Sequence, residues 1–295
     1  MGNGKIAAVV VTYNRLPLLQ ECVKKLEAQT APCDILIVNN ASTDGTTEWL
    51  GEQRRESFFA RNTGANLGGA GGFNYGMRWA VEAGYEYLWV MDDDCMPEPD
   101  ALSAFLSADS TLNGEYGFLS SKVLWKDGSV CTMNLQRETL TKNLKGFERK
   151  LQPVTMASFV SLFLPAGIVR EMGLPIKDFF IWTDDWEFTR RISRKYLCYA
   201  VADSVVVHKS KSNMGANIVT ESEDRLDRFD YLYRNDVYLY RREGLKGFCY
   251  EAVRLSGHIV RVLLKSRDNK AKRIGKIIGG TKTGLRFHPE IEFVE

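Results

Sequence analysis

Three consecutive aspartates, Asp92, Asp93 and Asp94, are the sharpest chemical signal in the sequence. They follow a short apolar run and repel one another, so folding them at that place is costly unless a cation relieves the repulsion. Carboxylate oxygens are hard ligands that suit Mg²⁺ or Mn²⁺, and these ions bridge phosphate groups. The alternative is a solvated acidic turn, because Pro97 and Glu98 follow closely.

A second carboxylate pair, Asp184 and Asp185, lies between Trp182 and Trp186. Carboxylates beside aromatic faces suit a polyol acceptor, because a sugar ring can stack on the aromatic side chain while a carboxylate removes a hydroxyl proton. The alternative is a capped helix start whose tryptophans belong to the core.

A glycine-rich segment begins at Asn66, where a helix should start. Such a segment lets backbone amides approach a phosphate or a sugar closely. An ordinary tight turn is the alternative, since the segment is neither a Walker loop nor a clean GxGxxG motif. The candidate contacts are Asn66, Gly68, Gly69, Gly71 and Gly72.

His208 follows a β-branched run. A single histidine in such a position is more often structural than a ligand. It becomes a candidate metal ligand only if its strand ends beside the three aspartates, because a neutral imidazole could then complete the coordination of the ion.

The scaffold for these residues is predicted by alternating strand and helix patterns in the first hundred residues. Strand and helix alternate at about 30-residue intervals, which indicates right-handed crossovers and a parallel sheet. Ligands of such sheets bind beyond the carboxyl ends of the strands. Buried strands are predicted at 6–11, 35–38, 58–60 and 87–91, and helices at 16–26, 46–55 and 70–83.

The rest of the chain is less regular. The polar stretch 126–152 is predicted to be an insertion or a hairpin, and the chain from 221 onward is predicted to be helical. We therefore expect an α/β fold, with a catalytic domain over 1–220 and a basic helical region over 221–295. Further strands are predicted at 119–124, 159–164 and 205–207, and a further helix at 184–194.

Composition excludes several classes of protein. The 295 residues are 44% hydrophobic and 26% charged, which rules out disorder and low-complexity scaffolds. The net charge of +2 argues against a dedicated nucleic-acid binder. This near-balance is unevenly spread, because residues 241–288 hold 13 Lys or Arg against 3 Asp or Glu. A basic C-terminal segment therefore follows a mildly acidic body.

The basic segment contains an amphipathic helix pattern. Such a helix can lie on an anionic membrane surface. The alternative is a helix packed on the catalytic domain or on a sister subunit, with its charges solvated. The apolar face is predicted to be Phe248, Ala252, Leu255, Ile259 and Val262, and the cationic face Arg254, His258, Arg261 and Lys265.

The sequence also predicts where the protein resides. No signal peptide precedes the first strand, no apolar run approaches the roughly 18 residues of a membrane span, and the six cysteines form no CxxC pair. We therefore expect a cytoplasmic protein with reduced thiols. The basic segment lacks the interleaved aromatic residues that stack on nucleic-acid bases, so nucleic acid is not an expected partner.

Four motifs together resemble a known family. The order VVVTYNR, VNNASTDGT, MDDD and WTDDWEF resembles the inverting family 2 glycosyltransferases with the GT-A fold, which is Rossmann-like with a mainly parallel sheet. The segment NLGGAGGFNYGM together with MDDDCMPEPDAL resembles the bacterial galactofuranosyltransferases. Those enzymes use UDP-galactofuranose to build cell-wall galactan, O-antigen or capsule. The resemblance covers roughly residues 5–242.

The resemblance assigns a role to each motif. It implies that Asp185 is the general base and that Asp184, Trp182 and Trp186 position the acceptor. It implies Mn²⁺ or Mg²⁺ as cofactor, held by Asp92, Asp94 and His208. The donor nucleotide is expected at Thr12, Tyr13, Asn14, Arg15, Asn39, Asp44, Asn66, Gly68, Gly69, Gly71, Gly72, Asp92 and Asp93.

The expected reaction transfers galactofuranose from a UDP-sugar donor to a glycan acceptor carried by a polyprenyl diphosphate. Such acceptors imply peripheral contact with the anionic inner face of the bacterial plasma membrane, and a homo-oligomer is compatible with the helical region. Two alternatives stay open. One is a rhamnosyltransferase that uses dTDP-rhamnose on the same fold, and the other is a catalytically inactive nucleotide-sugar-binding module.

Overall fold

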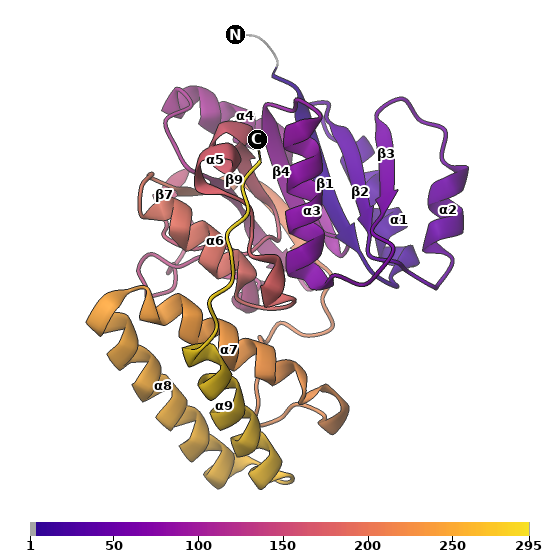
Figure 1. Ribbon diagram of the computed structural model, residues 1–295. Coiled ribbons are helices and arrows are strands. Elements are labelled where there is room, and N and C mark those ends of the chain that lie inside the picture. The colour runs from indigo at the N-terminus through magenta and orange to yellow at the C-terminus, as the bar shows by residue number, and fades with distance from the viewer. Residues whose placement is uncertain (1–3, 295) are drawn as a thin grey trace.

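The computed structural model describes residues 4–294, which form one sheet with helices on both faces and a helical cluster beside it (Figure 1). The strand order is β3-β2-β1-β4-β8-β6-β9-β5, and β7 pairs with β9. The strands are β1 (Ile6–Thr12), β2 (Asp34–Asn39), β3 (Phe58–Asn62), β4 (Tyr87–Asp92), β5 (Cys95–Pro97), β6 (Leu119–Trp125), β7 (Leu151–Pro153), β8 (Leu162–Pro165) and β9 (Tyr199–His208).

Helices connect these strands and continue beyond them. The α-helices are α1 (Leu16–Glu27), α2 (Thr46–Glu52), α3 (Gly68–Glu82), α4 (Ala101–Leu112), α5 (Ala166–Met172), α6 (Asp184–Ser193), α7 (Arg228–Arg241), α8 (Gly244–Lys265) and α9 (Lys270–Leu285). Short 3-10 turns are η1 (Thr132–Asn134), η2 (Lys177–Phe179) and η3 (Glu223–Arg225).

The first half of the sheet is parallel, as the crossover pattern predicts. Strand β1 pairs in parallel with β2 and with β4, and β2 pairs in parallel with β3. Every residue of β1 is buried, because helices cover both faces. Val9 belongs to the core on the α3 and α6 side, whereas its neighbour Val10 belongs to the core on the α1 and α4 side.

The second half of the sheet is mixed. Strand β8 runs antiparallel to β4 and β6, and β5 runs antiparallel to β9. The expected α/β architecture with flanking helices is confirmed. The antiparallel strands extend the parallel half of the same sheet. The last strand is longer than the predicted 205–207, because β9 follows β6 across a bulge between Ser121 and Lys122.

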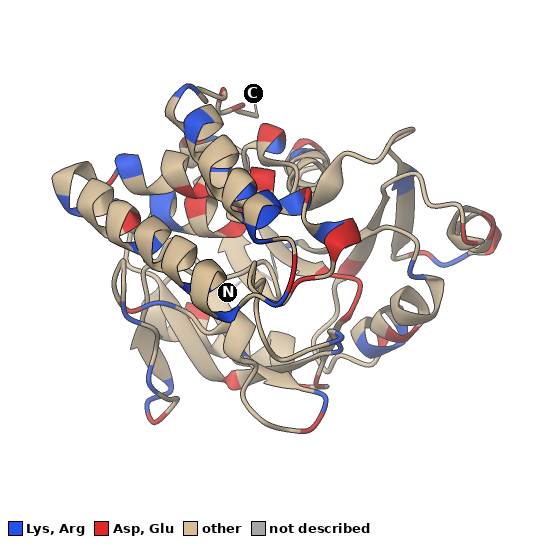
Figure 2. Cartoon of the chain, turned by 90° about the horizontal axis from the view of Figure 1, so that it is seen from below, with Lys and Arg blue, Asp and Glu red and all other residues tan. Residues whose placement is uncertain are grey.

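The C-terminal helices α7, α8 and α9 pack around a small apolar core of their own. Its buried members include Phe229 and Tyr233 of α7, Val262 of α8 and Ile277 of α9. Figure 2 shows the Lys and Arg residues of these helices from below. Between residues 4 and 294, no helix combines the length and the apolar character needed to cross a bilayer.

The predicted faces of α8 need correction. Arg254 and His258, predicted to be on a free cationic face, point inward and bond to Asp236 and to Tyr233 respectively. Phe248, predicted to be on the apolar face, is 59% exposed, whereas Val262 of the same predicted face is buried in the core shared with α7 and α9. Helix α8 therefore packs on α7 through a mixed face, in which Arg254 and His258 lie beside apolar side chains. Its outward apolar ridge consists of Leu245, Phe248, Val253, Val260, Leu263 and Leu264.

The residues that follow α9 return to the sheet and its flanking helices as an extended tail (Figure 1). The carbonyl of Glu292 accepts a hydrogen bond from the amide of Leu174 over 2.7 Å. The Glu292 carboxylate accepts from Asn74 of α3 and pairs with Arg78, and Val294 is buried in the sheet core. The helical cluster is therefore joined to the sheet region at both of its ends.

Candidate active site

The carboxyl ends of β1, β2 and β4 meet at one edge of the sheet. Thr12 stands opposite Asn39 in the strand register, and Val11 stands opposite Asp92. The three-aspartate turn therefore begins beside the end of β1. The hydroxyl of Thr12 donates to Oδ2 of Asp93 over 2.7 Å. Parallel pairing thus joins two of the segments predicted to bind the nucleotide.

Arg15 supplies a positive charge that reduces the repulsion among the carboxylates of the acidic turn. Its Nη1 lies 3.2 Å from Oδ1 of Asp93 and 2.7 Å from Oδ2 of Asp94. Burial raises the pKa of Asp93 to about 6, although the Arg15 charge opposes the shift. Half of the Arg15 side chain is exposed, so an anionic ligand can reach the guanidinium from solvent.

His208 ends β9 beside this turn, opposite Cys95 of β5. Its Nε2 lies 3.1 Å from Oδ1 of Asp94, and its Nδ1 lies 2.8 Å from Oδ1 of Asn134. The Asn134 amide group donates to Ser158, so the Asn134 oxygen accepts and Nδ1 of His208 carries the hydrogen. The other ring nitrogen, Nε2, is consequently directed at the Asp94 carboxylate.

Burial and mutual charge govern the protonation of this cluster. Burial alone would lower the pKa of His208, but the Asp94 carboxylate outweighs it and raises this pKa to about 10. Burial, and then the Asp94 charge, raises the pKa of Asp92 to about 7. Two carboxylates and an imidazole are donors that suit a divalent cation. Within residues 4–294, no three acidic, His or Cys side chains are arranged as a ligand group, so these three would have to shift to share an ion.

The second acidic pair begins α6, where the positive end of the helix dipole lies. Burial, and then the charge of Asp185, raises the pKa of Asp184 well above its usual range. Burial raises the pKa of Asp185 to about 7, against the hydrogen bond that the Trp186 amide donates to its Oδ1 over 2.7 Å. The charge of Asp92 adds to the raised pKa of Asp184, so the two acidic motifs lie close enough for their charges to interact.

The two tryptophans beside these carboxylates have different surroundings. Trp182 packs against Phe229 of α7, with the ring centroids 5.4 Å apart, so its ring lies against the helical cluster. The Arg137 guanidinium carbon lies 4.6 Å from the ring centroid of Trp186. Arg137 comes from the polar stretch 126–152, in which the sequence alone pointed to no site residue.

The loops after β1 and β2 hold each other in place. The backbone amide of Asn14 donates to the hydroxyl oxygen of Ser42 over 2.9 Å, and Oδ1 of Asn14 accepts from the backbone amide of Thr43 over 2.7 Å. Asn39 is buried at 1% exposure, whereas Tyr13 is 43% exposed. Of the residues predicted at this end of the nucleotide site, Thr12 and Asn39 are therefore buried, whereas Tyr13 and Arg15 present open side chains.

Asp44 organises the starts of two helices. Its Oδ2 accepts from the amide of Leu16, the first residue of α1, over 3.0 Å. Its Oδ1 accepts from the hydroxyl of Thr46, the first residue of α2, over 2.5 Å. These hydrogen bonds outweigh burial and hold the pKa of Asp44 below its usual range. The sequence predicts Asp44 as a nucleotide contact, and in the structure its carboxylate is occupied by the hydrogen bonds to Leu16 and Thr46.

The glycine-rich segment forms the first turn of α3. The Gly68 amide donates to Oδ1 of Asn66 over 2.9 Å. A Cβ at Gly72 would lie 2.5 Å from Cγ1 of Val11, so this glycine lets α3 pack closely on β1. A Cβ at Gly69 would meet open space. Helix packing thus explains Gly72, and Gly69 is the glycine that a ligand could approach.

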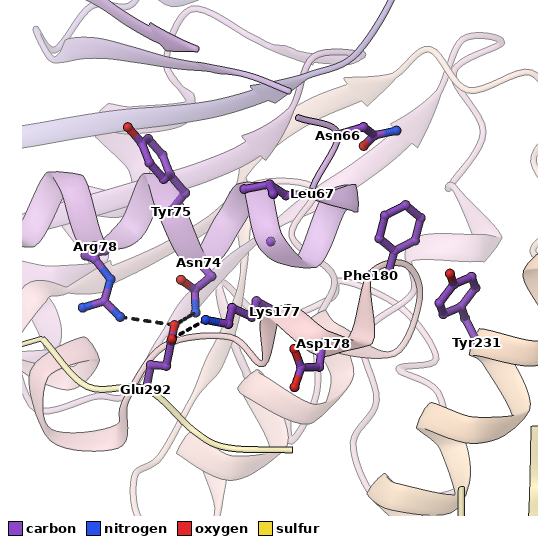
Figure 3. A pocket seen from close by; sticks show the side chains of 11 residues that line it. Asn66, Leu67, Asn74, Tyr75, Arg78, Lys177, Asp178, Phe180, Tyr231 and Glu292 are labelled. Atoms are coloured by element: carbon purple, nitrogen blue, oxygen red, sulfur yellow. Dashed lines mark hydrogen bonds and ion pairs between the residues drawn. The ribbon is translucent and has the colours of Figure 1, made fainter. Parts of the chain in front are cut away.

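A cavity of about 930 Å³ lies along α3, and Asp92–Asp94 and Asp184–Asp185 do not line it (Figure 3). Phe180 and Tyr231 stack at one end, with their ring centroids 5.1 Å apart. Asn66 and Gly71, both predicted to contact the donor, line its wall. This cavity therefore adjoins the predicted donor site without containing the acidic motifs.

Comparison with known sequences identifies the relatives of this chain. Residues 7–112 match the family described as Glycosyl transferase family 2. Galactofuranosyltransferase GlfT1 of Mycolicibacterium smegmatis is 27% identical over 258 residues, which are 82% of this chain and 84% of that protein. Undecaprenyl-phosphate mannosyltransferase of Micrococcus luteus is 32% identical over 108 residues, which are 35% of this chain and 44% of that protein.

Solved structures share the fold. The crystal structure of S. aureus TarS 1–349 in complex with UDP-GlcNAc aligns with a TM-score of 0.56 at 13% identity, covering 96% of this chain and 73% of that one. The mannosyltransferase PcManGT from Pyrobaculum calidifontis, in complex with GDP-Man and Mn²⁺, aligns with a TM-score of 0.56 at 14% identity, covering 97% and 76%. The expected GT-A fold is confirmed.

Proposed function

Residues 7–112 belong to glycosyl transferase family 2, and from that premise we propose that the protein is an inverting galactofuranosyltransferase. It transfers galactofuranose from UDP-galactofuranose to a hydroxyl group of a cell-surface glycan carried on polyprenyl diphosphate. The likeness to galactofuranosyltransferase GlfT1 supports this choice of donor, because it extends over 82% of the chain.

One observation carries the proposal. The acidic turn Asp92–Asp94 follows β4 and the carboxylate pair Asp184–Asp185 begins α6, near enough for the Asp92 charge to add to the raised pKa of Asp184. Transfer from a nucleotide sugar needs these two chemistries on opposite sides of one sugar, a site for the leaving diphosphate and a base for the acceptor.

Asp185 supplies the base. Its pKa of about 7 lets it stay ionised near neutral pH and still accept a proton readily. It removes the proton from the acceptor hydroxyl while the oxygen attacks the anomeric carbon. The bond from that carbon to the diphosphate oxygen breaks on the opposite face, so the configuration inverts. Asp184 is buried beside it, and burial together with the Asp185 charge raises the pKa of Asp184 well above its usual range, which favours the neutral form of Asp184.

Arg15 supplies a positive charge on the donor side, since its guanidinium is half exposed beside Asp94. Asp92, Asp94 and His208 would hold a divalent cation, which when bound supplies charge neutralisation to the leaving diphosphate. Asn134 keeps the hydrogen of His208 on Nδ1, so that Nε2 is the nitrogen that faces the acidic turn. The Mn²⁺ bound to PcManGT on the same fold supports Mn²⁺ or Mg²⁺ as the ion.

Access to a lipid-linked acceptor requires contact with a membrane. The outward apolar ridge of α8 is flanked by cations on one side, among them Lys246, Arg261 and Lys265. Apolar side chains beside Lys and Arg suit the interface of an anionic leaflet. We assign the ridge to peripheral contact with such a surface, which places the protein at the cytoplasmic face of the membrane. A homo-oligomer through the same ridge is the competing use.

A donor panel tests the proposed function. UDP-galactofuranose, other UDP-sugars and dTDP-rhamnose are each incubated with the protein, Mn²⁺ and a synthetic lipid-linked acceptor, and the product is read by mass. We expect a product heavier by galactofuranose, with loss of transfer in Asp185→Asn and retention of UDP binding. Transfer of rhamnose from dTDP-rhamnose would replace the donor assignment. UDP binding without transfer or hydrolysis of any donor would indicate an inactive binding module.

A further inference from the structure

The segment that leads into the carboxylate pair has an unusual backbone. Phe180, Trp182 and Thr183 have φ angles of 63°, 64° and 69°, although none of them is glycine. Bulky and β-branched residues rarely adopt this left-handed region, because the Cβ atom clashes with the backbone. Such a conformation persists only where surrounding groups over-determine it. The segment Phe180–Thr183 must therefore be held by its neighbours.

Asn235 of α7 is the main holding group. Its Nδ2 lies 3.0 Å from the carbonyl oxygen of Phe179, 3.2 Å from that of Ile181 and 2.9 Å from that of Trp182. Its Oδ1 accepts from Nε of Arg234 over 3.0 Å, which fixes the orientation of the amide. Asn235 is completely buried, so water does not compete for these three carbonyl groups.

Asp236, the next residue of α7, holds the end of the same segment. Its Oδ1 accepts from the hydroxyl of Thr183 over 2.6 Å. Its Oδ2 accepts from Arg254 of α8 over 2.5 Å. Thr183 is the residue from which α6 begins, and Asp185 is the second residue of that helix. The helical cluster therefore binds the segment that directly precedes the proposed base, Asp185.

The opposite side of the segment is fixed to α3. The Phe180 carbonyl accepts from the amide of Ala70 over 3.2 Å. A Cβ at Gly68 would lie 2.1 Å from the Phe180 carbonyl oxygen, so only glycine allows this approach. One strained segment thus touches the first turn of α3 on the donor side and α7 on the other.

We infer that Asn235 is a positioning residue for the proposed base. By donating from one side-chain amide to the carbonyl groups of Phe179, Ile181 and Trp182, it selects the left-handed conformation of Phe180–Thr183. That conformation sets where α6 begins and hence where the Asp185 carboxylate lies. The inference rests on the proposed function for the role of Asp185. The clamp, by which we mean the hydrogen bonds from Asn235 to the segment that leads into α6, rests on the contacts described above.

The chemistry of the clamp is specific to an amide. Alanine at position 235 leaves the carbonyl groups of Ile181 and Trp182 without their donor, whereas the Phe179 carbonyl keeps Arg234 and the Ile181 amide as donors. Aspartate has nearly the same shape but presents carboxylate oxygens to carbonyl oxygens, so it repels the segment instead of binding it. Both Asn235→Ala and Asn235→Asp should release the segment, and Asn235→Asp should do so without creating a cavity.

The test compares these two variants with Tyr233→Phe. Tyr233 lies two residues earlier on α7, and its hydroxyl shares a hydrogen bond with His258 and not with the carbonyl groups that Asn235 binds. The readouts are kcat for sugar transfer, KM for the acceptor, UDP affinity by calorimetry, and hydrogen exchange of the peptide that spans residues 178–186.

For Asn235→Ala and Asn235→Asp we expect kcat to fall by about 100-fold, the loss typical of a misplaced reacting group. We expect UDP affinity to fall much less than kcat, because the donor-side contacts of Arg15 and Asp92–Asp94 lie outside the segment and only the first turn of α3 touches it. Faster hydrogen exchange in residues 178–186 should accompany the loss. Tyr233→Phe should leave kcat and this exchange unchanged.

Wild-type kcat in a folded Asn235→Asp variant would overturn the inference, and so would an equal loss of kcat in Tyr233→Phe. Parallel losses of kcat and UDP affinity would also overturn it, because they would show a general structural role. If the wild-type protein transfers no sugar, the proposed function fails on its own. Hydrogen exchange in residues 178–186 would then still decide whether Asn235 holds the segment.

Discussion

The Nε2 atom of His208 lies 3.1 Å from Oδ1 of Asp94, while the opposite ring nitrogen is held by Asn134 at 2.8 Å. With Nδ1 carrying one hydrogen, the raised pKa of His208 places a second proton between the imidazole and Asp94 at neutral pH. A divalent cation at this site would have to replace that second proton.

Asn134→Ala should weaken Mn²⁺ binding. Without the Asn134 oxygen, the imidazole is free to place its hydrogen on Nε2, where it blocks coordination. Loss of such an orienting partner lowers metal affinity by about 10- to 100-fold. Calorimetric titration of Mn²⁺ in the presence of saturating UDP measures the change. Thr132→Ala, on the same 3-10 turn but bonded to Asn213, is the control. Equal Mn²⁺ affinity in Asn134→Ala and wild type would contradict the assignment of His208 to the metal.

The rate of transfer should rise with pH through about 7. Asp185 accepts a proton only when ionised, and burial raises its pKa to about 7. Below that pH, kcat should fall about tenfold per pH unit, and above it kcat should reach a plateau. The measurement is kcat at saturating donor, with UDP binding followed in parallel because the pKa of Asp92 is also about 7. A pH-independent kcat below 7, with UDP still bound, would remove Asp185 from the role of base.

Arg254→Leu should destabilise the fold. The Arg254 guanidinium pairs with Asp236 at 2.5 Å and with Glu251 at 2.7 Å, and all three side chains are largely buried. Removing the cation leaves two buried carboxylates unpaired, which lowers the free energy of unfolding by about 3–5 kcal/mol. Urea denaturation at neutral pH measures this change. Arg261→Leu, which alters an exposed position of the same helix, should change it by less than about 0.5 kcal/mol. Equal stability of the two variants would show that the buried network contributes little.

Acidic substitutions on the ridge of α8 should abolish membrane contact. Leu263→Glu combined with Leu264→Glu replaces apolar side chains that are 50% and 77% exposed. Binding to vesicles of phosphatidylglycerol and phosphatidylcholine at low salt should weaken at least about tenfold, because apolar burial and charge attraction are both lost. Leu197→Glu, at an equally exposed site away from α8, should bind as the wild type does. A change in oligomeric state with unchanged vesicle binding would assign the ridge to a sister subunit.

The sequence predicts the acidic edge of the sheet well, for a physical reason. Parallel strands must end at the same edge, so apolar runs that end in Thr12, Asn39 and Asp92 bring these residues together whatever the loops do. The confirmed GT-A fold follows from the same alternation of strands and helices. The glycine-rich segment is also found by its composition, but its packing on Val11 and Phe180 depends on the folded structure.

The supporting residues are not visible in the sequence. Asn134 and Arg137 reach the site from an irregular stretch without periodicity, and Asn235 reaches the base segment from a helix 50 residues further along the chain. No local pattern encodes such contacts. For α8, periodicity shows that the helix is amphipathic, but it does not show which face turns inward when buried ion pairs such as Arg254 with Asp236 compete with apolar packing.

The extended tail after α9 has a mechanical consequence for the whole molecule. Because Glu292 and Val294 anchor the far end of the helical cluster while α7 grips Phe180–Thr183, the cluster cannot swing about a single hinge. A surface that binds α8 would therefore fix two quantities at the same time, the tilt of the carboxyl edge of the sheet and its height above that surface. The distance between the bilayer and the reacting hydroxyl group is then fixed by the protein. The fold itself would therefore select acceptors of a particular length.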